Sequence, residues 1–141
     1  MSTTLVQKAS IRLCHTIIPS KFLKSAIEKF VNYRIGALPV VDQSKALKGI
    51  ISERDIIRQL HLSKNINDLQ VGSVMTRNVI TCSLDARANE VMEIMTKYRI
   101  RHIPITEGKK LLGIISIGDV VSRLLEKYKN EAELLKKYIN S

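Results

Sequence analysis

The chain contains the same pattern twice. Residues 33–41 read Tyr-Arg-Ile-Gly-Ala-Leu-Pro-Val-Val, and residues 98–106 read Tyr-Arg-Ile-Arg-His-Ile-Pro-Ile-Thr. A second pair of segments follows in the same order, Gly-Ile-Ile-Ser-Glu-Arg-Asp at 49–55 and Gly-Ile-Ile-Ser-Ile-Gly-Asp at 113–119. The residues shared by the two copies include turn-forming and polar residues. A chance similarity between two apolar patterns would not align these residues. A tandem repeat of this kind predicts two half-domains that face each other across a pseudo-two-fold axis.

Hydrophobic spacing predicts the same order of elements in each copy. An amphipathic helix leads into a short apolar strand that contains a proline, and a polar turn then leads into a second strand and a second helix. With a further strand in front, each unit reads strand, helix, strand, strand, helix, which is a mixed α/β (α+β) fold. The first helices are expected over 21–34 and 87–99, the proline-containing strands over 37–41 and 102–106, and the next strands over 47–52 and 111–116.

The repeat also sets the expected domain boundaries. Residues 1–65 form repeat 1 with its N-terminal segment, residues 66–126 form repeat 2, and residues 127–141 form a C-terminal helical extension. The polar stretch 61–74 is expected to connect the repeats. The last helix continues to about Tyr138 with apolar residues three and four apart. That face must pack on its own domain or on a second subunit, and the second alternative predicts a homodimer.

Composition places the chain among folded proteins that do not span a membrane. Its 141 residues are 45% apolar, and no apolar run approaches the roughly 18 residues that cross a bilayer. Cys14 and Cys82 have no motif spacing, so reduced thiols are expected rather than a disulfide. Basic residues among Ser and Thr precede the first acidic residue, Glu28, as in organelle transit peptides. Because Thr16 already belongs to the first repeat, we expect a cytoplasmic protein, with an organelle matrix as the alternative.

The positive charge indicates an anionic partner. The formal net charge is +10, so the surface attracts anions such as a nucleotide or a nucleic acid. Nucleic-acid surfaces usually combine a basic run with aromatic residues, whereas this chain is 4% aromatic, has no Trp and disperses its lysines. A nucleic-acid partner is therefore disfavoured.

Motifs of catalysis are missing from the sequence. It has no Gly-x-x-x-x-Gly-Lys-[Ser/Thr] phosphate loop, no Gly-x-Gly-x-x-Gly and no His-Glu-x-x-His. The three histidines, His15, His61 and His102, are scattered, so no metal-ligand cluster is expected. The chain is predicted not to be an enzyme and to require no cofactor.

These motifs resemble the cystathionine-β-synthase (CBS) domain, and the pair resembles a Bateman module over roughly residues 16–126. The markers are Val-Met-Thr at 74–76, Arg-Ile-Arg-His-Ile-Pro at 99–104, and the two Gly-Ile-Ile-Ser-x-x-Asp segments. Each marker alone is weak, but two sets in register are specific. Because the chain shows no catalytic domain beside the pair, it resembles the stand-alone two-CBS proteins.

The resemblance implies an adenine-nucleotide site in the cleft between the repeats. It implies that Asp55 and Asp119 accept hydrogen bonds from ribose hydroxyls, with Ser52 and Ser116 assisting, and charge-assisted bonds of this kind are strong. Adenine would lie in an apolar slot near the proline strands. The residues at the matching adenine positions are Thr16, Thr81, Leu38 and Ile103, and the neighbouring strands add Pro39 and Pro104 to the expected site. The cations available for phosphate are Arg34, Arg54, Arg99, Arg101 and His102.

The two copies differ at this site. Repeat 2 has Arg101 and His102 where repeat 1 has Gly and Ala, and repeat 1 has Glu53 and Arg54 where repeat 2 has Ile and Gly118. Gly118 would let a ligand approach the helix N-terminus, where unpaired N–H groups suit an anion. We therefore favour the cleft that contains Asp119, and leave open whether both clefts fill.

Structural explanations compete with these assignments. A Ser and an Asp three positions apart at a helix start also form an N-cap. Arg34 and Arg99 follow helix C-termini, where a cation is favourable without a ligand. His102 could be a hydrogen-bonded, half-buried histidine, and Tyr33 and Tyr98 are expected to be packing residues.

The resulting prediction is a non-enzymatic regulatory module that binds an adenine nucleotide and acts on an unidentified protein target. The ligand is expected to be AMP, or else ADP, ATP or NAD(H); S-adenosylmethionine shares the same ribose and adenine contacts. The alternatives are a scaffold dimer with a vestigial site and a nucleic-acid-binding protein.

Overall fold

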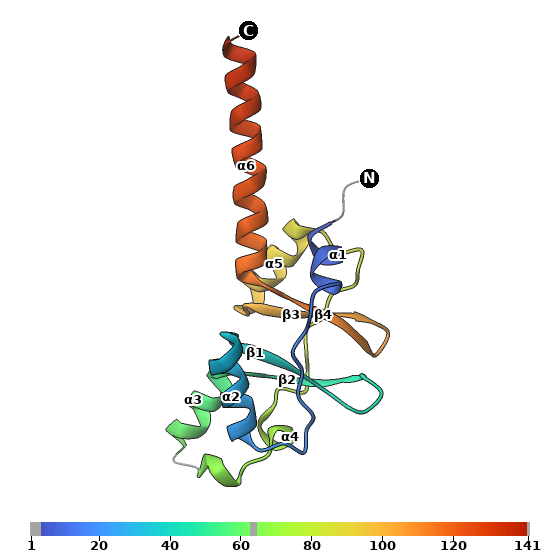
Figure 1. The fold of residues 1–141 in the computed structure, drawn as a ribbon, viewed down its shortest axis with the longest axis vertical. Coiled ribbons are helices and arrows are strands. Elements are labelled where there is room, and N and C mark those ends of the chain that lie inside the picture. The colour runs from blue at the N-terminus through green and yellow to red at the C-terminus, as the bar shows by residue number, and fades with distance from the viewer. Residues whose placement is uncertain (1–3, 63–64, 141) are drawn as a thin grey trace.

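The computed structural model describes residues 4–62 and 65–140, which form two similar halves stacked on each other (Figure 1). The predicted mixed α/β class, the tandem repeat and the long C-terminal helix are confirmed. Positions 1–3, 63–64 and 141 of the predicted units lie outside the described residues. The elements in chain order are α1 Leu5–Ser10, α2 Leu23–Tyr33, β1 Ala37–Val41, β2 Leu47–Ser52, α3 Glu53–His61, the 3-10 turn η1 Ile66–Asp68, α4 Val71–Val74, α5 Ala88–Tyr98, β3 His102–Glu107, β4 Lys110–Ser116 and α6 Ile117–Asn140.

Each half contains a two-stranded antiparallel sheet with a proline in its first strand. Pro39 of β1 pairs with Ile50 of β2, and Pro104 of β3 pairs with Ile114 of β4. Both hairpins carry a register shift at the same distance after the proline, so they bend alike. The hairpins are thus two copies of one structural unit, as the repeated sequence requires.

The leading strand of each unit is reduced to a single parallel bridge. The amide of Ile17 donates to the carbonyl oxygen of Pro39 at 3.1 Å, and the amide of Cys82 donates to that of Pro104 at 3.0 Å. Because proline has no amide hydrogen but keeps its carbonyl, each proline still takes part in the sheet through this bond.

Helices α2 and α5 end at arginines in the left-handed conformation. Arg34 and Arg99 both have a φ of 54°, and their amides donate to the carbonyl oxygens of Phe30 and Met95. This conformation reverses the chain from each helix into the strand that follows. Both arginines therefore stand at the C-terminal end of a helix, where their backbone forms the cap.

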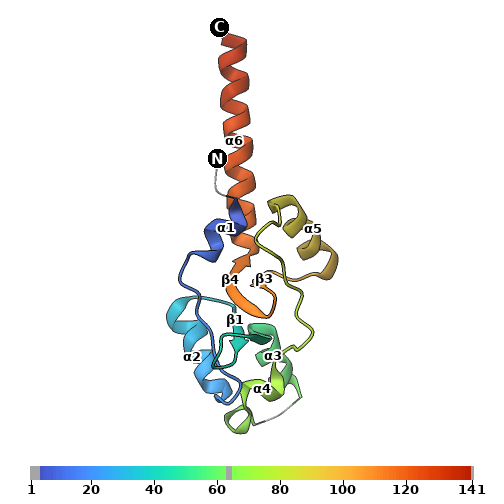
Figure 2. The same ribbon diagram turned by 90° about the vertical axis from the view of Figure 1, so that its right-hand side faces the viewer.

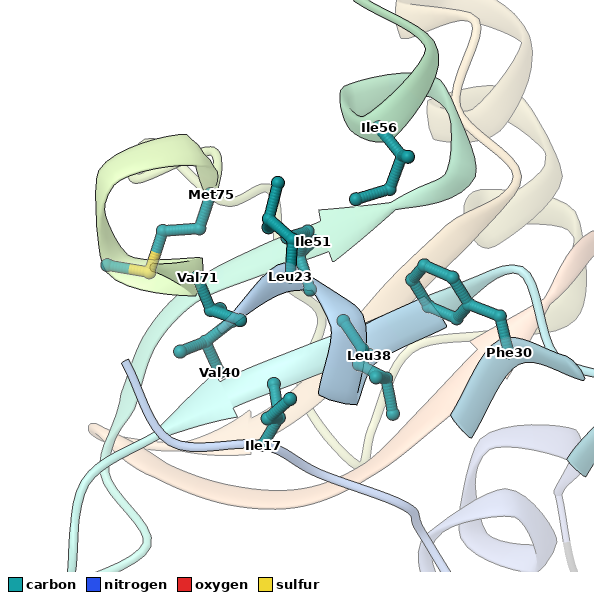
Figure 3. Packing of buried hydrophobic residues seen from close by; sticks show 10 residues of the cluster. Ile17, Leu23, Phe30, Leu38, Val40, Ile51, Ile56, Val71 and Met75 are labelled. Atoms are coloured by element: carbon teal, nitrogen blue, oxygen red, sulfur yellow. The ribbon is translucent and has the colours of Figure 1, made fainter. Parts of the chain in front are cut away.

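Two short helices cross between the halves. α1 lies against β4 and α6 of the second half, and α4 lies against β2 of the first half. Val6 and Ala9 therefore belong to the second hydrophobic core, whereas Val71 and Met75 belong to the first (Figure 3). The sequence division assigns α1 to repeat 1 and α4 to repeat 2, so each core includes a helix from the other stretch of chain. Helices of four and six residues are too short to show periodicity in the sequence.

A glycine in the second strand of each hairpin makes room for the crossing segment. A Cβ added to Gly49 would lie 2.7 Å from Met75 Sδ and 2.7 Å from the Thr76 carbonyl oxygen. A Cβ added to Gly113 would lie 2.9 Å from the carbonyl oxygen of Ala9. The backbone of each crossing segment thus rests directly on the strand, and the repeated Gly-Ile-Ile-Ser segment reflects that packing.

The two hairpins also meet each other at their turns, which lie on the same side of the molecule (Figure 1). The amide of Leu47 donates to the carbonyl oxygen of Lys109 at 2.8 Å, and the amide of Leu111 donates to that of Lys45 at 3.1 Å. These backbone bonds fix one end of the boundary between the halves. The candidate site lies toward the other end of the same strands.

Candidate functional site

A cleft of about 190 Å³ lies on the boundary between the halves. Its walls come from the start of β1, the end of β2, the first turns of α3, the segment after α4 and the start of β3. Both halves therefore contribute to it. Five residues singled out from the sequence line this cleft, namely Ser52, Arg54, Asp55, Arg101 and His102.

Asp55 combines a structural and a chemical role in this cleft. It is 4% exposed, and its Oδ2 accepts hydrogen bonds from the amide of Ser52 at 2.8 Å and from Ser52 Oγ at 3.1 Å. The predicted N-cap of α3 is therefore present. The other oxygen, Oδ1, lies 3.6 Å from Nη1 of Arg58, too far for a strong ion pair. A hydroxyl donor of a ligand could bond that oxygen without disturbing the cap.

Cationic side chains from both halves line the same cleft. Arg54 of α3 reaches across the boundary, where its Nη1 donates to the carbonyl oxygen of Arg99 at 3.5 Å. Arg58 lies one turn further along α3, and Arg101 enters from the second half. The cleft thus has two acidic side chains, Glu53 and Asp55, and three arginines, Arg54, Arg58 and Arg101, in its wall, so its positive charge exceeds its negative charge and favours an anion.

His102 lies against the first half at this boundary. Gly36 lies beside both His102 and Glu53, since a Cβ added to it would be in ordinary contact with His102 Cε1 and with the Glu53 carboxylate, each at 3.5 Å. Burial, and then the charge of Arg101, lower the pKa of His102, while Glu53 and Asp119 oppose that shift. The neutral imidazole is therefore favoured at pH 7, and a further negative charge nearby would favour the protonated form.

The segment after α4 forms the apolar wall of the cleft, and sequence reasoning missed it. Thr76, Asn78, Val79 and Ile80 line the cleft together with Ile100 of the second half. Val-Met-Thr at 74–76 marks the start of this segment in the sequence. The residues after it have no regular hydrophobic spacing, so only their position in the fold identifies them.

The second carboxylate, Asp119, is already bonded to a guanidinium of the same chain. Arg12 Nη1 lies 2.7 Å from Asp119 Oδ1, and Arg12 Nη2 lies 2.9 Å from Oδ2. Arg12 Nη2 also donates to the carbonyl oxygen of Ile114 at 3.2 Å, and the amide of Ser116 donates to Asp119 Oδ2 at 2.8 Å. The Arg12 bond lowers the pKa of Asp119 against the opposing effect of burial. Both oxygens of this carboxylate thus accept from Arg12, whereas Oδ1 of Asp55 has only the 3.6 Å contact with Arg58.

The difference between the two sites comes from one pair of equivalent residues. The repeat aligns Thr16 with Thr81, which aligns Arg12 with Arg77. Arg77 turns away from its carboxylate, and its Nη2 donates to the carbonyl oxygen of Gly72 at 3.0 Å. The sequence favoured the Asp119 cleft because Gly118 leaves space at the start of α6. That space is present, but the contact of Arg12 was not visible in the sequence because α1 was missed.

The other residues singled out from the sequence lie away from the Asp55 cleft lining. Leu38 and Ile103 are fully buried in the two cores, and Pro39 and Pro104 are buried in their strands. Thr16 lies in a separate hollow beside α2, where its carbonyl oxygen accepts a bond from Lys29. Among the remaining residues, Arg34 and Arg99 cap helices, Thr81 is exposed before the Cys82 bridge, and Ser116 and Gly118 begin the α6 region beside Asp119.

Two further findings concern residues 4–62 and 65–140. None of the helices there has the length and apolar character needed to cross a bilayer. The same residues contain no group of three or more His, Cys, Asp or Glu side chains arranged to hold a metal ion.

Comparison with known proteins identifies both repeats. A sequence model of the CBS domain matches residues 12–62 and 71–126. The mitochondrial CBS domain-containing protein CBSX3 of Arabidopsis thaliana is 35% identical over 119 residues, which are 81% of this chain and 58% of that protein. The chain thus spans little more than half the length of this relative.

Two solved structures with similar folds contain adenosine compounds. The CBS domain pair of protein MJ0100, in complex with 5′-methylthioadenosine and S-adenosyl-L-methionine, is 30% identical with a TM-score of 0.76, covering 90% of this chain and 99% of that one. CBSX2 in complex with AMP is 25% identical with a TM-score of 0.77 and the same two coverages. Both molecules have the two-repeat architecture described above.

Proposed function

Because this chain belongs to the CBS-domain family, we propose that it is a non-enzymatic regulatory module that binds an adenine nucleotide in the Asp55 cleft. AMP is the first candidate, followed by ADP, ATP, NAD(H) and S-adenosylmethionine. The relatives solved with AMP or with S-adenosyl-L-methionine support this class of ligand. The mitochondrial relative supports an organelle matrix as the alternative to the cytoplasm.

One observation carries the proposal: a carboxylate with a weakly engaged oxygen lies in a cleft whose cations come from both halves. Asp55 Oδ1 can accept a bond from a ribose hydroxyl, while Arg54 and Arg101 can bind phosphate. Val79 and Ile80 offer an apolar surface for the base. A cleft of about 190 Å³ is smaller than the roughly 300–1,000 Å³ of typical ligand pockets, so a nucleotide would extend into the cleft mouth.

The geometry supports one ligand for each chain. At Asp119 the guanidinium of Arg12 holds both carboxylate oxygens, so a ribose would have to displace a bidentate ion pair. At Asp55 a ribose would displace only a contact of 3.6 Å. We therefore reverse the preference drawn from the sequence and assign the ligand to the Asp55 cleft.

Regulation would act through the boundary between the halves. A ligand that bonds Asp55 of the first half and Arg101 of the second has higher affinity for the relative position of the halves that satisfies both contacts. Binding would then shift the population toward that position. The hairpin turns, joined by backbone bonds, would act as the fixed end of the movement. The protein target that detects this movement is not identified by any feature of the cleft.

Calorimetric titration of nucleotide-stripped protein tests the proposal. AMP, ADP, ATP, NADH, S-adenosylmethionine and adenosine are titrated separately, and a stoichiometry near one ligand per chain is expected for at least one nucleotide. Arg101→Ala should lower the affinity for AMP by about tenfold or more and the affinity for adenosine by much less, because a guanidinium binds the phosphate that adenosine lacks. Absence of binding by all six compounds would refute the proposal and leave the scaffold alternative. Binding of DNA or RNA that weakens steeply with salt would instead support a nucleic-acid partner.

A further inference from the structure

The long helix α6 leaves the body of the protein after its first two turns. It comprises 24 residues, and only its first part packs against α5, β4 and α1. Val120 is buried and Leu124 is half-buried, whereas residues 125–140 are all exposed. Figures 1 and 2 show the helix projecting from the upper half in two perpendicular views. An isolated helix of about this length is marginally stable in water, so the projecting part needs a partner.

The exposed part of α6 carries one continuous apolar stripe. Six apolar residues follow one another at alternating spacings of four and three, which is the spacing of the two core positions in a coiled-coil heptad. Leu125 is 65% exposed, Leu135 is 60% exposed and Ile139 is 70% exposed. The complete stripe, called here the α6 seam, consists of Val121, Leu125, Tyr128, Ala132, Leu135 and Ile139.

The charges beside the seam select a second copy in parallel orientation. With Leu125 and Ala132 at one core position of the heptad and Leu135 at the other, Glu131 and Lys136 flank the seam on opposite sides. Glu131 directly precedes the core residue Ala132, and Lys136 directly follows the core residue Leu135. In a parallel two-stranded coil, a flanking residue in the position of Glu131 faces the residue five positions further on in the partner helix. Glu131 of each copy then faces Lys136 of the other, giving two attractive pairs. In an antiparallel coil, each flank of one helix faces the same flank of the other helix. The flank that contains Lys129 and Lys136 would then face its own copy, which brings like charges together.

We propose that α6 forms a parallel two-stranded coiled coil with α6 of a second copy through the α6 seam. The two bodies would then lie side by side at the same end of the coil, because α6 begins at the body in both copies. This assigns the predicted homodimer to one segment and one orientation. It is independent of nucleotide binding, since the seam lies outside the Asp55 cleft.

Disulfide trapping tests the orientation. Leu135→Cys places a thiol in the seam, and Asn130→Cys places one on the opposite side of the same helix. Burial raises the pKa of Cys82 to about 11 and also raises the pKa of Cys14, so both native thiols react slowly at pH 8. Under mild oxidation Leu135→Cys should cross-link most chains and Asn130→Cys few. Equal cross-linking of the two variants, or efficient cross-linking only in a mixture of Leu125→Cys and Leu135→Cys chains, would overturn the parallel coil.

Leucine-to-glutamate substitutions test the seam itself. The double variant Leu125→Glu with Leu135→Glu should have a weaker helical circular dichroism signal than the wild type. When Ile139→Cys is added to this double variant, disulfide cross-linking between chains should be abolished. Leu134→Glu is the matched control, because Leu134 is 65% exposed on α6 but lies off the seam. Sedimentation should give a dimer for the wild type and for the Leu134 variant. A wild-type monomer at all concentrations, a trimer, or equal effects of the seam and control variants would contradict the proposal.

Discussion

Arg12 and Asp119 form a bidentate ion pair between residues 107 positions apart in the chain. The guanidinium donates to both carboxylate oxygens, at 2.7 and 2.9 Å. The equivalent pair in the other repeat, Arg77 and Asp55, is not formed, because Arg77 donates to a backbone carbonyl instead. A chain built from two copies of one unit therefore has one carboxylate held by a bidentate arginine and one with only the longer 3.6 Å contact to Arg58.

Removing Arg12 should create a second ligand site. In Arg12→Ala both oxygens of Asp119 lose their guanidinium partner, so the calorimetric stoichiometry for AMP should rise from one toward two per chain. Arg77→Ala is the matched control at the equivalent position, and its stoichiometry should stay at one. A value of one in both variants would mean that Arg12 does not close the Asp119 site.

Asp55→Asn should weaken nucleotide binding by roughly ten- to hundredfold, the loss expected for about 1.5–3 kcal/mol from a charge-assisted bond. Asparagine keeps an oxygen that can accept the bonds of Ser52, so the cap of α3 and the melting temperature should change little. Asp119→Asn is the control, because Arg12 already occupies that carboxylate. Affinity is measured by calorimetry and folding by thermal unfolding. A larger loss of affinity in the Asp119 variant than in the Asp55 variant would show that the ligand binds at Asp119.

Nucleotide binding should take up a proton at His102. The pKa of His102 is lowered from 6.5 by burial and by the charge of Arg101, and a bound phosphate would favour the protonated form. Protonation of His102 should therefore favour binding as the pH falls from 7.5 to 6, whereas protonation of the ligand phosphate opposes binding. Titrations in two buffers of different ionisation heat measure the proton uptake. The His102→Gln variant should not take up this proton when the nucleotide binds. The same proton uptake in the variant and the wild type would show that His102 is not the group that is protonated.

The same lowered pKa has a consequence for the ligand-free protein. Since the unfolded chain binds a proton at His102 more readily than the folded one, the stabilising effect of the neutral imidazole is complete above pH 6.5 and is lost as the pH falls below it. The difference in free energy of unfolding between the wild type and His102→Gln should therefore shift against the wild type from pH 7.5 to pH 5.5. Urea titrations at the two pH values measure this shift.

Gly113→Ala should loosen α1 from the second half. The added Cβ would lie 2.9 Å from the carbonyl oxygen of Ala9, so the crossing segment must move away at a loss of about 1–3 kcal/mol. Amide exchange in α1 should accelerate more than exchange in α2. Gly118→Ala is the control, because its Cβ would meet only Ser116 Oγ, at 3.6 Å. Similar exchange rates in the two variants would argue against this packing role.

The repeated motifs predicted most of the fold because they mark the hairpins and their helices. β1 and β2 have the bounds expected from the sequence, and the first helix of each repeat differs by only one or two residues at each end. Pro39 and Pro104 identified the strands, and Ser52 identified the start of α3 correctly. These elements depend on local spacing and capping, which are present in a single sequence.

The candidate site was predicted only in part because it depends on contacts between distant segments. Asp55 and Arg101 were singled out by motif, and the fold brings both to one cleft. Arg12 and the wall residues Val79 and Ile80 lie on segments without periodicity, and their roles follow from how α1 and α4 cross between the halves. The sequence could compare the two repeats residue by residue, but it could not show which arginine turns toward its carboxylate.

The crossing of α1 has a consequence for the order in which the chain acquires its structure. α1 is synthesised before β4 and α6, yet Val6 and Ala9 pack in a core that β4 and the start of α6 complete. Contacts at such sequence separation form slowly, because a long loop must close before they are made. During synthesis the first half can assemble around α4 once residue 76 has emerged, while α1 must wait for the second half. α1 is therefore synthesised before the elements it packs on and is among the last of the described elements to reach its native contacts.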